Sequence, residues 1–190
     1  YARIYNWRPS SSPKKPSAVI DRWLLSTLHK LIKEVKEGVD DYDLSRGVEP
    51  YVGFVDQLTN WYIRRSRRRF WEDEATEDRT QAFETLYQVL LGLVKVAAPF
   101  IPFITDAIYM NLKDPSMPDS VHLCLYPEYH PETRDENLEE AMKLVQTAVS
   151  LGHALRKEHK LKVRQPLAKA HVITPNSRDL HFLQDQRHLI

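Results

Sequence analysis

The stretch FETLYQVLLGLVKVA, at residues 83–97, decides the fold class of this chain. Its apolar residues recur every three or four positions, so they share one face of a helix with 3.6 residues per turn. The matching positions are Phe83, Leu86, Tyr87, Leu90, Leu93, Val94 and Ala97. Because proline cannot extend the hydrogen-bond ladder, the pattern predicts a helix that begins after Thr76 and ends before Pro99.

A second amphipathic helix is predicted upstream, near the start of the chain. Ser17 is a suitable N-cap for it, and Gly38 is a suitable residue to end it. Its apolar face is predicted to consist of Ile20, Trp23, Leu24, Leu28, Leu31 and Val35. The spacing therefore predicts that this face is buried in the core.

The segment between these two helices is also predicted to be helical, with an interruption. Asp43 is expected to cap the first turn, and Gly47 and Pro50 are expected to interrupt the helix because proline removes a backbone donor. A helix then resumes by residue 51 and reaches residue 71. Its buried face is predicted to comprise Tyr51, Val55, Leu58 and Tyr62.

Downstream of residue 98, two further helices are predicted. A short one is expected over residues 101–113, followed by an extended segment or short strand over residues 121–126. Thr133 and Glu136 form a capping-box pattern, which predicts the start of a longer helix. The apolar face of that helix is predicted to contain Leu138, Met142, Val145, Val149 and Leu155.

The end of the chain has a different pattern. Residues 169–174 alternate weakly and are expected to form a strand, and residues 179–190 are expected to form a helix. The predicted architecture is a bundle of four or five helices that leads into a small α/β part.

Composition excludes several classes of protein. With 42% hydrophobic and 28% charged residues among 190, the chain is typical of a soluble globular protein. The one cysteine, Cys124, excludes an internal disulfide and a cysteine-based zinc cluster. No apolar run approaches the roughly 20 residues that cross a bilayer. Because the first residue is Tyr1 and not methionine, we expect a fragment of a longer polypeptide.

No self-contained active site is recognisable in the sequence. A glycine-rich phosphate loop, an HExxH pair, a nucleophile elbow and paired metal-binding cysteines are all missing. The eight histidines are scattered without ligand spacing, and the paired carboxylates lie in polar linkers. The sequence therefore predicts neither a catalytic nor a metal site, and indicates that the chain is not an enzyme on its own.

The stretch NWYIRRSRRRFW, at residues 60–71, is rich in arginine and tryptophan. At about 100° per residue, Arg64, Arg67 and Arg68 share one helical face, and Trp71 lies beside them. Guanidinium groups bind phosphates through paired hydrogen bonds, and aromatic rings stack on unpaired bases. This face is therefore a candidate RNA contact.

The same arginines also have acidic residues four positions downstream. Arg68 with Glu72 and Arg69 with Asp73 are possible helical ion pairs, which contribute only a few tenths of a kcal/mol each. Arg69 projects near the apolar side. Spacing alone leaves RNA contact and structural ion pairing as alternatives.

A second basic stretch, HALRKEHKLKVRQPL, occupies residues 153–167. Between Arg156 and His171 six Lys and Arg residues face one acid, Glu158, which gives a local charge of +5 against a net charge of +1 for the chain. Lysines near a helix end also complement the helix dipole. Charge alone therefore does not distinguish between two roles for this segment, namely phosphate contact and helix capping.

Five segments, in order, resemble the isoleucyl-tRNA synthetases, which are class Ia aminoacyl-tRNA synthetases. Residues 60–71 resemble part of their helical domain, and APFIPFITDAIYMNL at residues 98–112 is similar to the next helix pair. SVHL with Pro127, LKVRQPL and the opening YARIYNW are similar to further pieces of that family. NWY and APFIPF also fit valyl or leucyl enzymes, but the combination with RRSRRRFW and VRQPL favours the isoleucyl family.

The resemblance implies a mainly α fold, namely an anticodon-binding helical bundle with a short extended segment and the start of a small α/β part. Residues 1–16 would be a linker from a catalytic core, residues 17–160 the bundle, and residues 161–190 the start of a truncated C-terminal domain. The implied function is recognition of the anticodon stem-loop of isoleucine tRNA, for aminoacylation by a catalytic domain outside these residues. RNA contacts would come from Arg64, Arg67, Arg68, Trp61, Trp71, Arg156, Lys160, Lys162, Arg164 and Gln165.

The resemblance also implies partners and a setting. The parent would be an isoleucine–tRNA ligase that uses ATP and Mg²⁺, with any zinc sites outside these residues and no cofactor held within them. The catalytic domain would be a partner in cis, and the protein a cytoplasmic monomer without membrane association. Two alternatives remain: the same domain of a valyl or leucyl enzyme, or a helical scaffold whose arginine-rich face docks on the catalytic domain.

Overall fold

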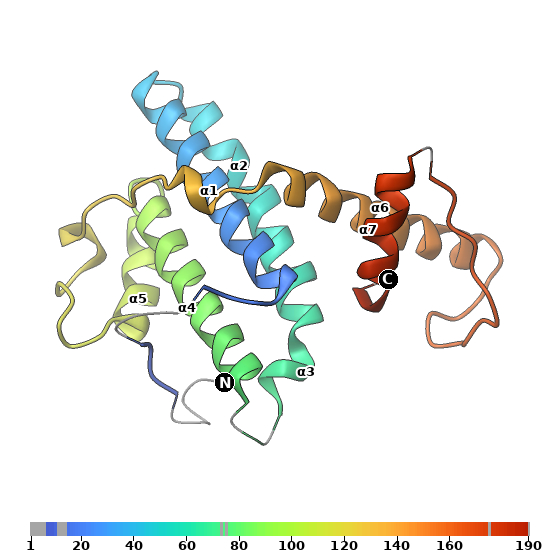
Figure 1. Ribbon diagram of the computed structural model, residues 1–190. Coiled ribbons are helices and arrows are strands. Elements are labelled where there is room, and N and C mark those ends of the chain that lie inside the picture. The colour runs from blue at the N-terminus through green and yellow to red at the C-terminus, as the bar shows by residue number, and fades with distance from the viewer. Residues whose placement is uncertain (1–6, 11–14, 73, 75, 175, 190) are drawn as a thin grey trace. The chain divides into compact units, whose positions relative to one another are not determined.

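The computed structural model describes residues 7–10, 15–72, 74, 76–174 and 176–189 (Figure 1). Contacts divide the chain into two compact units, Tyr1–Arg134 and Asp135–Ile190. The fold is mainly α, which confirms the predicted class. The strand expected over residues 169–174 is not formed, and the described ranges contain no strand at all.

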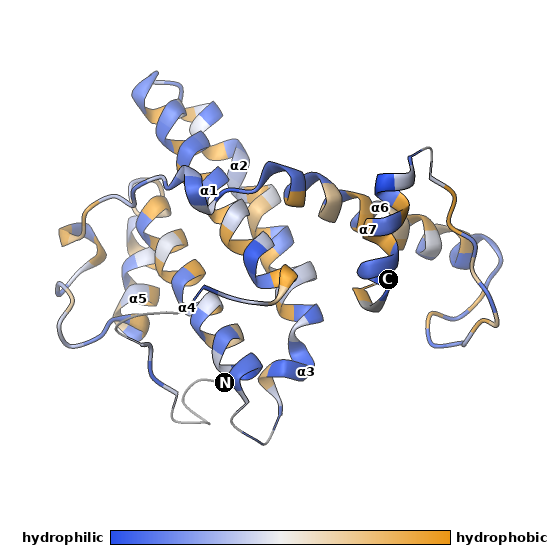
Figure 2. Cartoon of the chain, in the orientation of Figure 1, coloured by the Kyte–Doolittle hydropathy of each residue, from blue (hydrophilic) through white to orange (hydrophobic). Residues whose placement is uncertain are grey.

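The first unit is built around α1 (Val19–Asp40), which packs against α2 (Leu44–Asp56) and α4 (Glu77–Ala97). Polar and apolar residues alternate along these helices in Figure 2, as amphipathic packing requires. Next along the chain, α5 (Pro102–Leu112) packs on α4. The predicted apolar face of α1 is buried, with Trp23 and Leu24 at 1% and 0% exposure. The helix after Thr76 is also confirmed, and the Thr76 side chain accepts a hydrogen bond from the backbone N–H of Arg79.

The two predicted ends of α1 were wrong. Ala18 is the N-cap, and the Ser17 hydroxyl instead donates to Oε1 of Gln81 on α4 (2.9 Å). The helix runs beyond Gly38 because the left-handed position that ends it is occupied by Tyr42, with φ 57°. The backbone N–H of Asp43 then donates to the Gly38 carbonyl (2.8 Å), which closes the helix in a Schellman motif.

The predicted interruption of the next helix was also wrong. Asp43 caps α2 as expected, but α2 continues through Pro50. The proline leaves the carbonyl of Arg46 without its helical donor, but the helix continues on both sides of Pro50. Val55, expected inside, is 42% exposed because Phe54 takes the inward position on this helix.

The described part of the predicted linker packs on α4. The Trp7 ring lies 5.8 Å from Phe83 and 5.9 Å from Tyr87, measured between ring centroids. The backbone N–H of Ser10 donates to Oε2 of Glu84 (3.1 Å). Residues 1–6 and 11–14 of that linker lie outside the described residues.

The predicted extended segment over residues 121–126 begins as a 3₁₀ turn, Val121–Leu123, and becomes extended only at Cys124. The Asp106 carboxylate explains the turn, since it accepts from the Ser120 hydroxyl (2.7 Å) and the Val121 N–H (2.9 Å). These two bonds lower the pKa of Asp106.

The second unit consists of α6 (Glu136–Glu158), which packs on α7 (Ser177–Asp185). This division of the chain falls before α6, whereas the sequence placed a boundary after residue 160. The N-cap of α6 is Asp135 and not Thr133, because the Asp135 carboxylate accepts from the Leu138 N–H (3.0 Å). Leu138, Met142 and Val145 are buried as predicted, but Leu155 is 57% exposed.

A histidine pair fastens the segment between α5 and α6 to α1. The backbone N–H of His130 donates to Nδ1 of His29 (3.2 Å), and the two imidazole rings are 5.4 Å apart. Burial lowers the pKa of His29 below its ordinary value of 6.5, and His130 lowers it further, while Glu132 opposes both. The Tyr129 ring also faces His29.

Acidification is therefore expected to loosen this segment. Because the pKa of His29 is lower in the folded chain, its contribution to stability is present above pH 6.5 and is lost as pH falls through the folded pKa. Protonated Nδ1 also ceases to accept the bond from His130. Hydrogen exchange of residues 129–133, corrected for intrinsic rates, should be faster at about pH 5.5 than at about pH 7.5. His29→Gln keeps an acceptor without titrating in this range, so an unchanged pH dependence in that variant would contradict the assignment.

Candidate nucleic-acid interface

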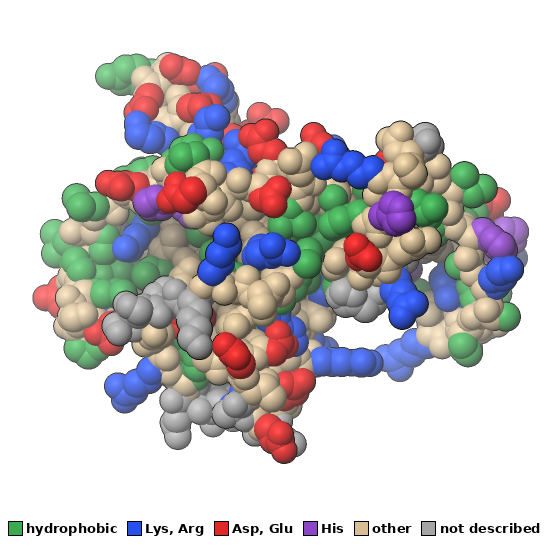
Figure 3. Space-filling view, in the orientation of Figure 1, with side chains coloured by type: hydrophobic (Ala, Val, Ile, Leu, Met, Phe, Trp, Pro, Cys, Tyr) green, Lys and Arg blue, Asp and Glu red, His purple; other side chains and the backbone are tan. Residues whose placement is uncertain are grey.

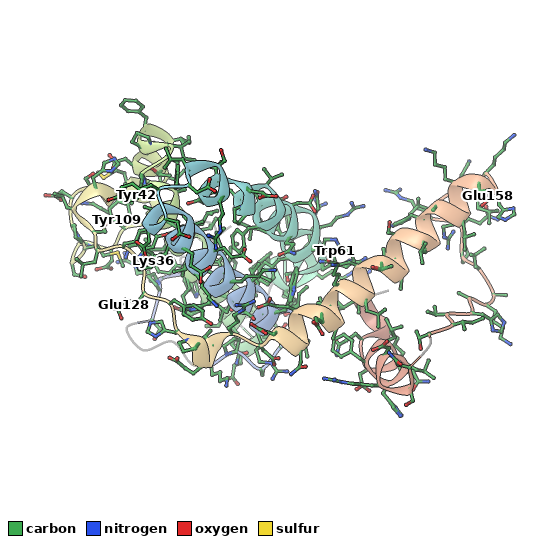
Figure 4. The ribbon with its side chains drawn as sticks, turned by 90° about the horizontal axis from the view of Figure 1, so that it is seen from above. Lys36, Tyr42, Trp61, Tyr109, Glu128 and Glu158 are labelled. Carbon is green, nitrogen blue, oxygen red and sulfur yellow. The ribbon has the colours of Figure 1, made fainter. Side chains whose placement is uncertain are left out.

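The arginine-rich stretch lies on a distorted helix. A π-helical segment, Gln57–Ile63, follows α2 directly, and after a break at Ser66 the short helix α3 (Arg67–Phe70) completes the run. Figure 4 shows Trp61 on this segment. Wide π turns within helices are frequent at functional sites. The inward side of the run is anchored by three buried residues, Leu58, Tyr62 and Phe70.

One arginine of the run is committed to structure. Arg69 makes a paired contact with Asp21 of α1, in which Nη1 and Nη2 lie 2.8 and 2.7 Å from the two carboxylate oxygens. Its Nε also donates to Asp78 (2.7 Å), and Asp21 accepts from the Tyr62 hydroxyl (2.8 Å). Burial alone would lower the pKa of Arg69, but the bonds to Asp21 and Asp78 outweigh it and raise that pKa. Asp73, the partner expected from spacing, lies outside the described residues.

The remaining predicted arginines of this run face solvent. Arg64, Arg67 and Arg68 are exposed, and they form no ion pair with any described residue. The two alternatives raised by the sequence therefore apply to different residues. Arg69 is ion-paired, whereas the other three arginines have no ion pair with a described residue.

Each predicted tryptophan lies beside an arginine. The Arg65 guanidinium lies 4.9 Å from the centroid of the Trp61 ring, and that of Arg67 lies 6.0 Å from the Trp71 ring. Burial, together with the charge of Arg64, lowers the pKa of Arg65. Trp71 is 52% exposed, so a large part of its surface faces solvent. The sequence did not predict Arg65; its position four residues after Trp61 was the available signal.

The second predicted set lies in the other unit, where α6 ends. Lys160, Lys162, Arg164 and Gln165 are all exposed. Arg156, which the sequence assigned to RNA contact, donates from Nη1 to the carbonyls of Lys162 (3.0 Å) and Gln165 (2.9 Å). Figure 3 shows Lys, Arg and His side chains beside exposed apolar ones over the segment that follows α6.

The two sets of residues belong to different units, and each forms a basic surface of its own unit. We call residues Arg64, Arg65, Arg67, Arg68, Trp61 and Trp71 the arginine face, and residues 160–165 the basic turn. Both combine positive charge with exposed apolar or aromatic surface, which is the chemistry that binds phosphates and unpaired bases.

Among the described residues, no group of three or more His, Cys, Asp or Glu side chains is placed to hold a metal ion. No helix in the described ranges has the length and apolar character required to cross a bilayer. The two surfaces offer binding groups, namely guanidinium, ammonium and indole.

Comparison with known proteins agrees with this chemistry. A family model described as the anticodon-binding domain of tRNA ligase matches residues 21–173. The isoleucine–tRNA ligase of Protochlamydia amoebophila is 62% identical over 190 residues, covering 100% of this chain and 18% of the relative. The enzymes of the same name from Chlamydia pneumoniae and Chlamydia trachomatis serovar L2 are 49% and 48% identical, each over 94% of this chain. The chain spans 17–18% of the length of these relatives.

Proposed function

Because the chain belongs to the family of anticodon-binding domains of tRNA ligases, we propose that it is the anticodon-binding domain of an isoleucine–tRNA ligase. The names of three relatives that are 48–62% identical support the amino-acid specificity over a valyl or leucyl one. Its ligand is then the anticodon stem and loop of isoleucine tRNA. The catalytic domain of the ligase is the partner in cis.

The observation that carries this proposal is the fixed arginine face. The buried contact of Arg69 with Asp21 holds the helix, and Arg64, Arg67 and Arg68 are exposed on it without an ion pair to any described residue. These three guanidinium groups bind phosphates, while Trp61 and Trp71 provide rings for bases that leave their stack. On the second unit, Lys162 and Arg164 add further phosphate contacts.

The chemistry takes place elsewhere in the ligase. Phosphate contacts fix the register of the tRNA, and side chains that read the anticodon bases supply specificity. Binding energy gained at the anticodon then helps to orient the acceptor end in the catalytic domain. ATP and Mg²⁺ act in that domain, as does any zinc site, and the chain itself holds no cofactor. We further propose that the ligase is a cytoplasmic monomer.

The test uses the full-length ligase with isoleucine tRNA and an anticodon-swapped tRNA, at several salt concentrations. The variant replaces Arg64, Arg67 and Arg68 with glutamine. Log affinity falls as log salt rises, and the loss of three phosphate contacts should make this fall less steep by about 2, at about 0.7 per contact. The matched control replaces Lys30, Lys33 and Lys36 with glutamine. These lysines pair with acidic residues on α1, so the slope should stay nearly unchanged.

Two results would overturn the proposal. Equal affinity of the wild-type ligase for both tRNAs would exclude anticodon recognition. Equal loss of aminoacylation in the triple variant with whole tRNA and with an acceptor minihelix that lacks the anticodon would indicate that the arginine face docks on the catalytic domain instead. RNA contact predicts that only the reaction with whole tRNA is impaired.

A further inference from the structure

The basic turn follows α6 at a helix end with an unusual residue. Lys160 adopts φ 55°, one of two non-glycine residues with positive φ among those described. The backbone N–H of Leu161 donates to the Arg156 carbonyl (2.8 Å), and that of Lys160 donates to the Lys157 carbonyl (3.1 Å). These two bonds make a Schellman motif, whose left-handed position usually holds glycine. A lysine there retains a positive charge at the cost of backbone strain.

A β-turn comes directly after this motif. The backbone N–H of Gln165 donates to the Lys162 carbonyl (3.0 Å), which places Val163 and Arg164 at the tip. Val163 is 64% exposed, and Arg164 is exposed too. A four-residue turn without neighbouring strands has little of its own to hold it in one conformation.

The Arg156 side chain supplies two hydrogen bonds that hold this turn. A single nitrogen of its side chain, Nη1, donates to the carbonyls of both end residues, Lys162 (3.0 Å) and Gln165 (2.9 Å). Because these are the first and last residues of the turn, the guanidinium group bridges its open side. The bonds carry a full positive charge on the donor, which makes them stronger than bonds between neutral groups. The side chain is also only partly exposed, in contrast to the lysines and arginine around it.

We propose that Arg156 is a positioning residue, which clamps the basic turn so that Lys162 and Arg164 meet RNA phosphates in a fixed arrangement. This inference rests on the proposed function and assigns Arg156 a different role from direct phosphate contact. A turn that is ordered before binding loses less conformational entropy when RNA arrives, so the clamp raises affinity without adding a contact. The left-handed conformation of Lys160 turns the backbone at the end of α6, so that the carbonyls of residues 162 and 165 come within reach of the Arg156 side chain.

The first test measures the clamp without RNA, by hydrogen exchange in the full-length ligase. Arg156→Gln removes the cation and its reach to both carbonyls, so exchange across residues 162–165 should increase about tenfold or more. Lys157→Gln is the matched control, since it removes an equal charge from the same helical turn and keeps both clamp bonds. Lys160→Gly should also leave the exchange unchanged, because glycine adopts the left-handed conformation without strain.

The second test is a double-mutant cycle on tRNA binding in the same ligase. Arg156→Gln and Arg164→Gln should each weaken binding by about tenfold. The loss of affinity in the double variant should be clearly smaller than the product of the two single losses. A direct phosphate contact by Arg156 predicts losses that multiply. Multiplying losses, or an exchange rate at residues 162–165 that Arg156→Gln does not change, would overturn the clamp.

The cycle also separates this inference from the proposed function. If the wild-type ligase does not distinguish the native anticodon from the swapped one, the proposed function fails whatever Arg156 does. If the wild-type ligase distinguishes them and the losses multiply, only the clamp is overturned.

Discussion

Replacing Arg69 with methionine is expected to lower the free energy of unfolding by about 3–5 kcal/mol, more than any change on the arginine face. The substitution leaves the Asp21 carboxylate, which is 0% exposed, without its cation. Losing the partner of a buried charge is far more destabilising than the intact pair is stabilising, because the carboxylate has lost its hydration and keeps only the hydrogen bond from the Tyr62 hydroxyl (2.8 Å).

Arg68→Met is the matched control for this prediction. It removes the same chemical group one residue earlier, where the side chain is exposed and forms no ion pair with a described residue, so stability should change by less than about 0.5 kcal/mol. Urea unfolding of the chain, followed by circular dichroism, gives both values. Similar midpoints for the two variants would show that the contact with Asp21 does not hold the helix.

Gly38→Ala is expected to destabilise the chain by about 1–3 kcal/mol, although alanine is the better helix former. A Cβ atom on Gly38 would lie 2.6 Å from the backbone nitrogen of Gly47 and 2.7 Å from its Cα. Both neighbours are backbone atoms of α2, so no side chain can rotate away. The two helices must separate, and the packing of α1 on α2 is lost in part.

Gly53→Ala, on the outer side of α2, should have the opposite effect. A Cβ atom there meets nothing within 4 Å, so alanine gains about 0.5–1 kcal/mol from its lower entropy in the unfolded chain. The midpoint temperature of thermal unfolding should therefore be lower for Gly38→Ala and higher for Gly53→Ala. A shift in the same direction for both would refute the close contact between α1 and α2.

The helices were largely predictable because their signals are local. The apolar spacing over residues 83–97 and the cap at Thr76 both lie within the helix that they define, and the structure confirms α4 there. The errors occurred where a helix end depended on another part of the chain. Gly38 resembled a glycine that ends a helix, but its lack of a side chain instead allows the backbone of Gly47 to approach α1 closely. The helix over residues 44–56 continues through Pro50, although proline removes one backbone donor.

The candidate surfaces were predictable in composition but not in role. Charge and residue type marked both the arginine face and the basic turn in the sequence. Spacing could not show that Arg69 pairs with Asp21, 48 residues away along the chain. The bonds from Arg156 to the carbonyls of Lys162 and Gln165 were equally invisible, because they depend on the path of the backbone after α6.

The sequence by itself therefore determined the helical class, the positions of most helices and the resemblance to a tRNA-binding family, since periodicity, caps and motifs are properties of neighbouring residues. Only the tertiary structure decided which cations are held inside and which stand free. A guanidinium group is drawn to whichever carboxylate or carbonyl the fold brings within about 3 Å of it, and that distance depends on segments far apart in the chain.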